Sequence, residues 1–215
     1  MRWLRPAAAG ALLLTTAATA QAQSRAPLLQ VRTELRALVP VSARMSAEVH
    51  LNQYVNTRWG VSDEIKTGAG LEQAWRHFRL YTGYEHVVLR DTLRRHTEER
   101  GLVEATASVR PLDWLGLSDR QKTEIRDISG QFSTRWQNRV RADVGPERLA
   151  ITPWVARELS YDTRYAIINR RIWWYGVRFN GNANVNVELF EMQEYDSRRA
   201  IIWQRATGVA LRYHA

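Results

Sequence analysis

Apolar and polar residues alternate with a period of two along most of this chain. In MSAEVHLNQYV, residues 45 to 55, Val49 and Leu51 alternate with Glu48, His50 and Asn52. The alternation recurs in VEATASVR (103–110), RLAITPWVARE (148–158), NVNVELF (184–190) and WQRATGVALRYHA (203–215). This period predicts β-strands with one apolar and one polar face, and therefore an all-β fold.

Ten segments carry the pattern, and their lengths indicate strands that cross a membrane. They span 43–56, 61–73, 76–90, 100–111, 114–127, 132–143, 148–161, 165–180, 183–193 and 199–214. At roughly 11 to 16 residues each, they exceed the usual strand of a globular protein and are long enough to cross a bilayer at a tilt. We predict a single antiparallel transmembrane β-barrel of about ten strands, with twelve as the alternative.

Two further stretches bear on the number of strands. The run VRTELRALV (31–39) alternates in part and ends at Pro40. Including it gives an odd number, whereas single-chain bacterial barrels have even numbers, so we expect that it lies outside the barrel or that a twelfth strand accompanies it. Residues 91–99, DTLRRHTEE, are predicted as a solvated loop that exposes Glu98 and Glu99, with a short helix as the less favoured alternative.

The predicted links and the aromatic residues both suit a barrel in a bilayer. RPLDW, VGPER and NGNAN are short and rich in turn formers, whereas LRDTLRRHTEERG and the stretches around NTRWGVSD and RDISGQ are longer or more charged. With a periplasmic C-terminus, the short links would face the periplasm, as in bacterial barrels. Aromatic side chains near segment ends would form interfacial girdles. They are Tyr54, Trp59, Trp75, Tyr84, Trp114, Trp136, Tyr161, Tyr165, Trp173, Tyr175, Trp203 and Tyr213.

The first 22 residues have the composition of a secretory signal peptide. Arg2 and Arg5 flank the start, an apolar centre follows, and Ala-Gln-Ala closes the segment. We divide the chain into this signal peptide (1–22), an N-terminal segment that is a candidate additional strand (23–42) and an outer-membrane barrel (43–215). Removing the two arginines takes the formal net charge from +9 to +7. Export argues against nucleic acid as the partner of this basic chain.

Composition narrows the ways in which the domain is stabilised. The chain has no cysteine, so no disulfide staples this exported domain. No window after the leader approaches 18 uninterrupted apolar residues, which argues against transmembrane helices. A mean hydropathy of −0.43 beside nine Trp and eight Tyr is typical of a membrane barrel, whose alternating strands leave hydropathy low.

Two neighbouring segments place a charged or amide side chain at every second position: RQKTEIR (120–126) and RWQNRVR (135–141). In a barrel the apolar row faces acyl chains and the polar row fills a narrow lumen, where buried charges need partners. We therefore predict a lumenal charge network. Its members are Glu85, Glu104, Arg120, Lys122, Glu124, Arg126, Arg135, Arg139, Arg141, Glu158, Arg170, Arg178 and Glu188. A solvated basic face and an anion-selective pore are alternatives that use the same residues.

The central and C-terminal half resembles the domain of unknown function 2490 family of bacterial outer-membrane proteins. The resemblance rests on the order of DRQKTEIRD, STRWQNRVR, ITPWVARELSYD, NRRIWWYGVRF and GVALRY, over residues 119 to 213. It implies an outer-membrane β-barrel and provides no catalytic residues to carry over. The chain ends in Tyr213-His214-Ala215, where outer-membrane proteins usually end in an aromatic residue.

Candidate chemistry is sparse. His50 and His86, with Ser46 and Ser108 as candidate neighbours, are the residues on which a lipid hydrolase or acyltransferase would depend, but no local nucleophile signature is present. The histidines lack metal-ligand spacing. We predict no catalytic residue, cofactor or metal site.

The preferred hypothesis is a structural barrel or small, porin-like conduit in the bacterial outer membrane. Its partners would be outer-membrane lipids and the barrel-assembly machinery that inserts it. The oligomeric state is left open. A lipid-modifying enzyme and a secreted soluble β-sandwich or lipocalin-like binder are the alternatives.

Overall fold

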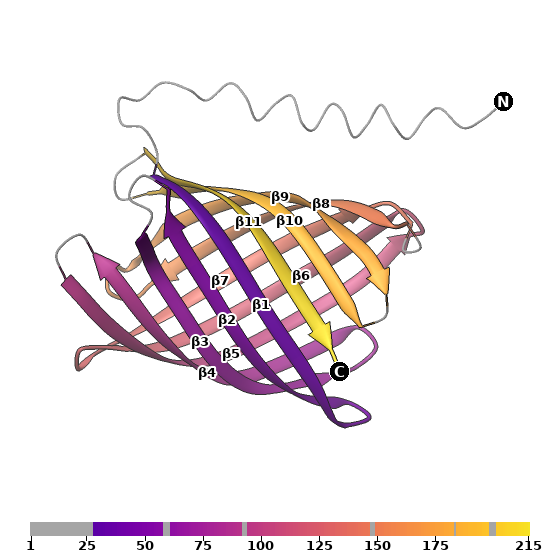
Figure 1. The fold of residues 1–215 in the computed structure, drawn as a ribbon, viewed down its shortest axis with the longest axis horizontal. Helices are drawn as coiled ribbons and strands as arrows, with labels where there is room; N and C mark the ends of the chain where they lie inside the picture. The colour runs from indigo at the N-terminus through magenta and orange to yellow at the C-terminus, as the bar shows by residue number, and fades with distance from the viewer. Residues whose placement is uncertain (1–27, 58–60, 92–93, 147–148, 183, 198–200) are drawn as a thin grey trace.

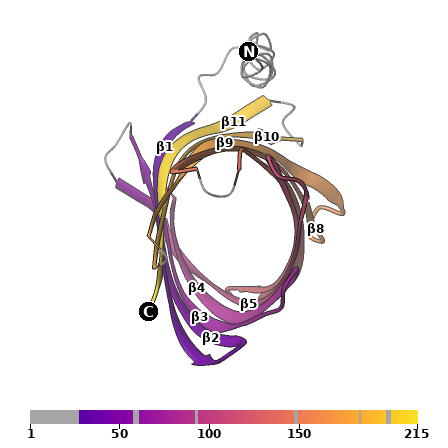
Figure 2. The same ribbon diagram turned by 90° about the vertical axis from the view of Figure 1, so that its right-hand side faces the viewer.

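The computed structural model describes residues 28–57, 61–91, 94–146, 149–182, 184–197 and 201–215, and the predicted signal peptide lies outside them. The described chain forms a closed barrel of eleven strands (Figures 1 and 2). They are β1 (Leu28–Ser42), β2 (Met45–Asn56), β3 (Val61–Ala74), β4 (Phe78–Asp91), β5 (Arg94–Leu112), β6 (Leu115–Ile128), β7 (Gln131–Val144), β8 (Ile151–Asp162), β9 (Ile167–Asn182), β10 (Val185–Asp196) and β11 (Ile201–His214). Among these residues, no helix is long and apolar enough to cross a membrane.

Every pair of sequence neighbours is antiparallel, but the barrel closes through a parallel pair. β1 runs beside β11 in the same direction, from Leu28 opposite Gln204 to Leu38 opposite His214 (Figure 1). This corrects the expectation of an entirely antiparallel barrel with an even number of strands. The 31–39 run is a barrel strand, and the described residues contain no twelfth one. We call the end at which β1 begins the N-terminal rim and the end at which β11 finishes the C-terminal rim.

The predicted loop at 91–99 is also wrong. Residues 94–99 belong to β5, which pairs with β4 in an unbroken register from Asp91 opposite Arg94 to Phe78 opposite Ala107. The alternation could not be recognised in the sequence because both faces of this stretch carry charged residues. Glu98 faces the lumen, whereas Glu99 faces outward.

The predicted difference in link length between the two ends of the barrel is absent. Ser129 and Gly130 alone join β6 to β7 at the N-terminal rim, and their positive φ angles, 54° and 83°, are those of a tight hairpin turn. Asp127 supports the turn by accepting a hydrogen bond from the Gly130 amide at 2.7 Å. At the C-terminal rim, two residues likewise join β1 to β2.

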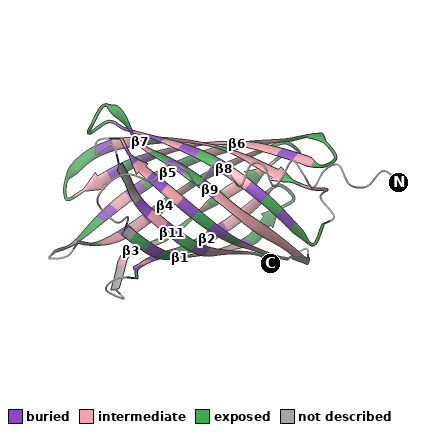
Figure 3. Cartoon of the chain, turned by 90° about the horizontal axis from the view of Figure 1, so that it is seen from above, coloured by how far each residue is buried: buried purple, intermediate pink, exposed green. Residues whose placement is uncertain are grey.

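Buried and exposed residues alternate along the strands (Figure 3), with most apolar side chains directed outward and most polar side chains into the lumen. In β2, Val49 and Leu51 are exposed, whereas Glu48, His50 and Asn52 are buried. An outward apolar wall around a polar interior is the arrangement of a barrel whose surrounding solvent is lipid.

Aromatic residues mark the C-terminal rim. Trp75, Phe78, Trp114 and Tyr213 are all exposed there, as an interfacial girdle requires. Tyr54 is an exception to the predicted girdle: it faces the lumen, with the guanidinium of Arg32 4.4 Å from its ring centroid. Trp59 and the side chain of Trp203 lie outside the described residues.

Val187→Arg tests the lipid-facing assignment. Val187 faces outward in the apolar part of β10, so a cation there should destabilise the barrel by about 2–4 kcal/mol and lower the yield of folded protein in vesicles. Gln193→Arg, on the same face of the same strand but opposite Trp173 and Arg205 where polar residues begin, is the matched control and should fold normally. Equal folding of the two variants would contradict the assignment.

Candidate functional site

The two charged ladders lie side by side on β6 and β7. Their register places Arg120 directly opposite Arg139, a pairing of like charges that destabilises neighbouring strands unless a counter-ion intervenes. Glu158 of β8 provides this counter-ion. Its Oε2 lies 3.0 Å from Arg120 Nη2 and accepts a hydrogen bond from Arg139 Nε at 2.6 Å. Glu104 lies 3.6 Å from Arg120 on the other side.

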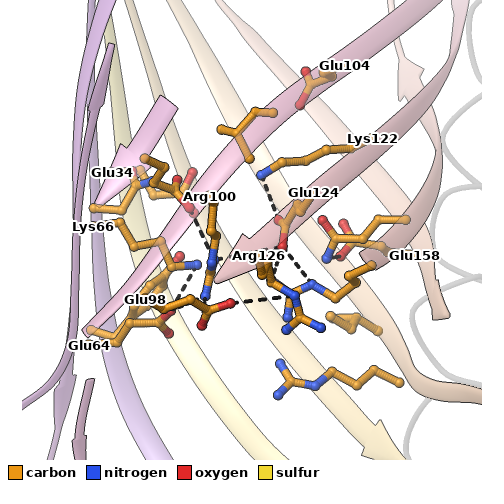
Figure 4. A pocket seen from close by; sticks show the side chains of 18 of the residues that line it. Glu34, Glu64, Lys66, Glu98, Arg100, Glu104, Lys122, Glu124, Arg126 and Glu158 are labelled. Carbon is orange, nitrogen blue, oxygen red and sulfur yellow. Dashed lines mark hydrogen bonds and ion pairs between the residues drawn. The ribbon is translucent and has the colours of Figure 1, made fainter. Parts of the chain in front are cut away.

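Glu124 is a second carboxylate that several cations surround (Figure 4). It is 1% exposed and accepts a hydrogen bond from Arg135 Nε at 2.8 Å. Lys122 Nζ lies 3.0 Å from its other oxygen, and Arg100 Nη1 lies 3.9 Å from Oε2. A buried charge is tolerated when partners of this kind replace water, and here three strands provide them.

Arg100 of β5 links carboxylates from four strands, because Glu124 of β6 joins those of β3, β4 and β5. Its guanidinium lies 3.1 Å from Glu85 of β4, 2.9 Å from Glu98 of its own strand and 3.7 Å from Glu64 of β3. Glu98 also lies 3.5 Å from Arg126 (Figure 4). The prediction that Glu98 is solvated is therefore wrong: it is 3% exposed and connects two arginines.

The network continues to the N-terminal rim. Asp162 at the end of β8 lies 2.5 Å from Arg126 and 3.0 Å from Arg164, which is in the link to β9. Nearby on β9 and β10, Arg170 lies 3.3 Å from Glu194.

A separate ion cluster lies toward the C-terminal rim. Arg141 lies 2.8 Å from both Asp143 and Glu188, and its guanidinium is 4.1 Å from the ring centroid of Trp154. Arg178 lies 3.5 Å from Asp143. Every predicted member of the network thus faces the lumen and forms an ion pair with another described residue.

His50 lies between two buried carboxylates. Its Nδ1 is 3.3 Å from Glu48, and its Nε2 is 3.3 Å from Glu85. Both ring nitrogens therefore face carboxylates, and among the described residues neither the Ser46 nor the Ser108 hydroxyl forms a hydrogen bond with a histidine ring. This geometry suits a member of an ion cluster rather than a general base beside a nucleophile.

His86 points to the outer wall. Its Nδ1 lies 2.7 Å from Glu99 of β5, and Tyr84 donates a hydrogen bond to the same carboxylate. Thr67 of β3 is the cross-strand neighbour of His86. The outer wall thus carries a histidine with a carboxylate on one side and a hydroxyl residue on the other.

Two cavities lie among the described residues of the lumen. The larger, of about 360 Å³, extends from the middle of the barrel toward the N-terminal rim and is lined mainly by charged side chains. A smaller one, of about 30 Å³, lies toward the C-terminal rim between Tyr81 and Arg212. Arg36 and Glu104 line both, so they separate the two spaces. The larger cavity has room for roughly a dozen waters.

The larger cavity has an excess of positive charge. Eleven Arg and Lys residues and eight Glu residues line it, a net charge of +3 with histidines neutral. An apolar cluster that includes Trp154, Trp174 and Phe190 fills the lumen along β8, β9 and β10. The larger cavity is therefore polar and cationic, and it lies beside the packed rings of this apolar cluster.

Sequence reasoning missed several members of the site. They include Arg36, Glu48, His50, Glu64, Lys66, Glu98, Arg100, Asp143, Asp162, Arg164 and Glu194. Most occupy the same alternating positions as the predicted residues, so strict parity from each strand start would have found them. Arg164 lies in a turn, where no such signal exists.

Comparisons with known proteins show a likeness in fold. No family model matches the sequence, and the search of curated proteins gives no match. Among solved structures, the barrel is similar to LpxR from Salmonella typhimurium, with a TM-score of 0.49 and 8% identity over 82% of this chain and 84% of that chain. In the described part of the chain, no group of three or more His, Asp or Glu side chains is arranged to hold a metal ion.

Glu158→Leu tests the central counter-ion. It should leave Arg120 and Arg139 facing each other without a shared carboxylate and destabilise the barrel by about 3 kcal/mol, measured as a lower denaturant midpoint in vesicles. Glu191→Leu removes an exposed outward carboxylate and is the control, with a small expected effect. An unchanged midpoint for Glu158→Leu would show that the pairing contributes nothing.

Proposed function

We propose that this protein is a bacterial outer-membrane β-barrel whose lumen is filled by paired charges, so that it acts as a structural barrel or a very narrow conduit rather than an open porin. The observation that carries the proposal is the interior itself: outward apolar faces surround a lumen in which Arg36 and Glu104 separate two cavities. Ion pairs across the lumen occupy the space that a porin leaves to water.

The proposal includes the cellular location of the protein, its route of insertion and its family. Insertion by the barrel-assembly machinery and contact with outer-membrane lipids follow from a barrel of this type. Kinship with the domain of unknown function 2490 family is part of the proposal and rests on the residues between 119 and 213 alone.

Two measurements test the proposal on one preparation. Protein from a membrane fraction should migrate differently on a detergent gel before and after boiling, because a closed barrel resists detergent until heated. In planar bilayers the folded protein should conduct weakly. The double variant Arg36→Ser and Glu104→Ser joins the two cavities and should conduct several-fold more, with a preference for anions because the lining has a net positive charge.

A protein that shows no heat shift and stays soluble without detergent would contradict the barrel in a membrane. A large wild-type conductance would instead contradict the filled lumen and leave the barrel intact.

A second candidate, a lipid-modifying enzyme, is favoured by the outer-wall group of Thr67, His86 and Glu99. A hydroxyl, an imidazole and a carboxylate in this order are the parts of a nucleophile, its base and an orienting group. Refolded protein would then release fatty acid from phospholipid, and His86→Ala would abolish release. His50→Ala, inside the lumen, is the control that should retain it. No release by the wild type would exclude this candidate.

A further inference from the structure

The outer wall formed by β8, β9, β10 and β11 divides into two halves. Outward residues toward the C-terminal rim are apolar, and the outward polar residues lie in the next rows toward the N-terminal rim, beside Leu159, Trp173 and Tyr195. The apolar set is Ile151, Pro153, Val155, Val177, Phe179, Val185, Val187, Leu189, Val209 and Leu211. The polar set is Arg157, Arg171, Glu191, Gln193, Arg205 and Thr207. The change from apolar to polar marks the level at which acyl chains give way to headgroups.

Three arginines surround one tryptophan at this boundary. The register places Arg157 opposite Trp173, Trp173 opposite Gln193, and Gln193 opposite Arg205. Arg171 is two residues before Trp173 on the same face. Neighbouring strands are about 4.8 Å apart, so Arg157 and Arg205 lie about 14 Å apart across the wall. We call Arg157, Arg171, Trp173 and Arg205 the outer basic patch.

The side chains of the patch are available to a ligand. Arg157 and Arg171 are exposed, Trp173 is 49% exposed, and Arg205 is half-buried, with its Nε covered and without a hydrogen-bond partner among the described residues. The guanidinium of Arg157 lies 5.6 Å from the Trp173 ring centroid, which holds its aliphatic stem against the wall. None of the three arginines forms an ion pair with another residue in the described ranges, although nearly all lumenal arginines do. Glu191 is the single described acid on this part of the wall.

The opposite wall has the reverse charge. Glu99, Asp119 and Asp127 face outward on β5 and β6, and His86 and Arg90 of the neighbouring β4 are the described basic groups beside them. The outer basic patch is therefore specific to one side of the barrel and does not result from an evenly basic surface.

We propose that the outer basic patch binds the phosphate groups of an anionic lipid of the surrounding membrane, with the lipid's acyl chains lying along the apolar half of the same wall. This inference rests on the proposed function, because it needs the barrel to stand in a bilayer. Guanidinium groups match phosphate oxygens in two-pronged hydrogen bonds. An arginine at the edge of the hydrocarbon region is costly unless an anion or water satisfies it, and a lipid phosphate does so without removing it from the wall.

Two features of the patch indicate a lipid rather than a free anion. The arginines are spread over about 14 Å, which suits a headgroup with more than one phosphate or two neighbouring headgroups rather than one small ion. Val155, Val177 and Val209 continue the same face toward the C-terminal rim, so a ligand of matching shape has an anionic head and an apolar tail.

The test is lipid binding by the refolded full-length protein in a non-ionic detergent, followed by native mass spectrometry. The probes are a diphosphorylated glucosamine lipid, the same lipid without its phosphates, and inorganic phosphate alone. The test variant is Arg157→Gln, Arg171→Gln and Arg205→Gln together. The matched control replaces three exposed arginines near links, Arg44, Arg76 and Arg90, by Gln and so removes the same charge.

We expect the wild type and the control to bind the phosphorylated lipid alike, and the patch variant to bind it at least about tenfold more weakly. Binding of the lipid without phosphates should be equally weak for all three proteins. Equal binding of the phosphorylated lipid by patch variant and control would overturn the proposal, and so would binding of inorganic phosphate as tight as that of the lipid.

The heat shift on a detergent gel distinguishes failure of the lipid-binding proposal from failure of the proposed function. A patch variant that retains the heat shift is folded, so its loss of lipid binding reports on the patch alone. A wild type that shows no heat shift would contradict the proposed function before the lipid question arises.

Discussion

The pairing of charges inside a closed sheet is the constraint on which the rest of this structure depends. Closing eleven strands leaves a lumen too narrow for bulk water throughout, so nearly all inward arginines pair with carboxylates, most of them on another strand. Glu158 and Glu124 each meet this requirement for more than one cation. The network therefore ties strands together around the barrel, in addition to the backbone ladder, and it determines how much space remains for water.

In the lumen, glycines on one strand lie next to large side chains on the neighbouring strand. A Cβ at Gly68 would lie 2.5 Å from His50 Nε2, so the absence of a side chain on β3 gives the imidazole its place between two carboxylates. Gly208 gives similar room to the ring of Phe190. Large or charged side chains from the neighbouring strand thus lie over the glycines that face the lumen. Glycine in a strand often marks such a close approach.

The period-two pattern was sufficient to predict the all-β barrel, the outward direction of residues such as Val49 and the inward direction of Glu158. The pattern failed where both faces of a strand carry charges, and it could not show which distant strands pair with each other. Arg94 to Glu99 carry charges on both faces, so a strand looked like a loop. The strand before Pro40 was doubtful because an even number of strands was assumed, and pairing of the first strand with the last cannot be read from local pattern. Tyr54 was placed at a rim by residue type, although its parity with Asn52 directs it inward.

The parallel seam has a consequence for the order of assembly. Each antiparallel hairpin joins residues close in the chain, whereas the seam joins residues 28–38 to residues 204–214 and closes a loop of nearly the whole described chain. Loop-closure entropy makes such a contact slow to form, and parallel ladders are slightly weaker per residue. The seam is thus the natural last event in folding and the natural first place for the wall to open.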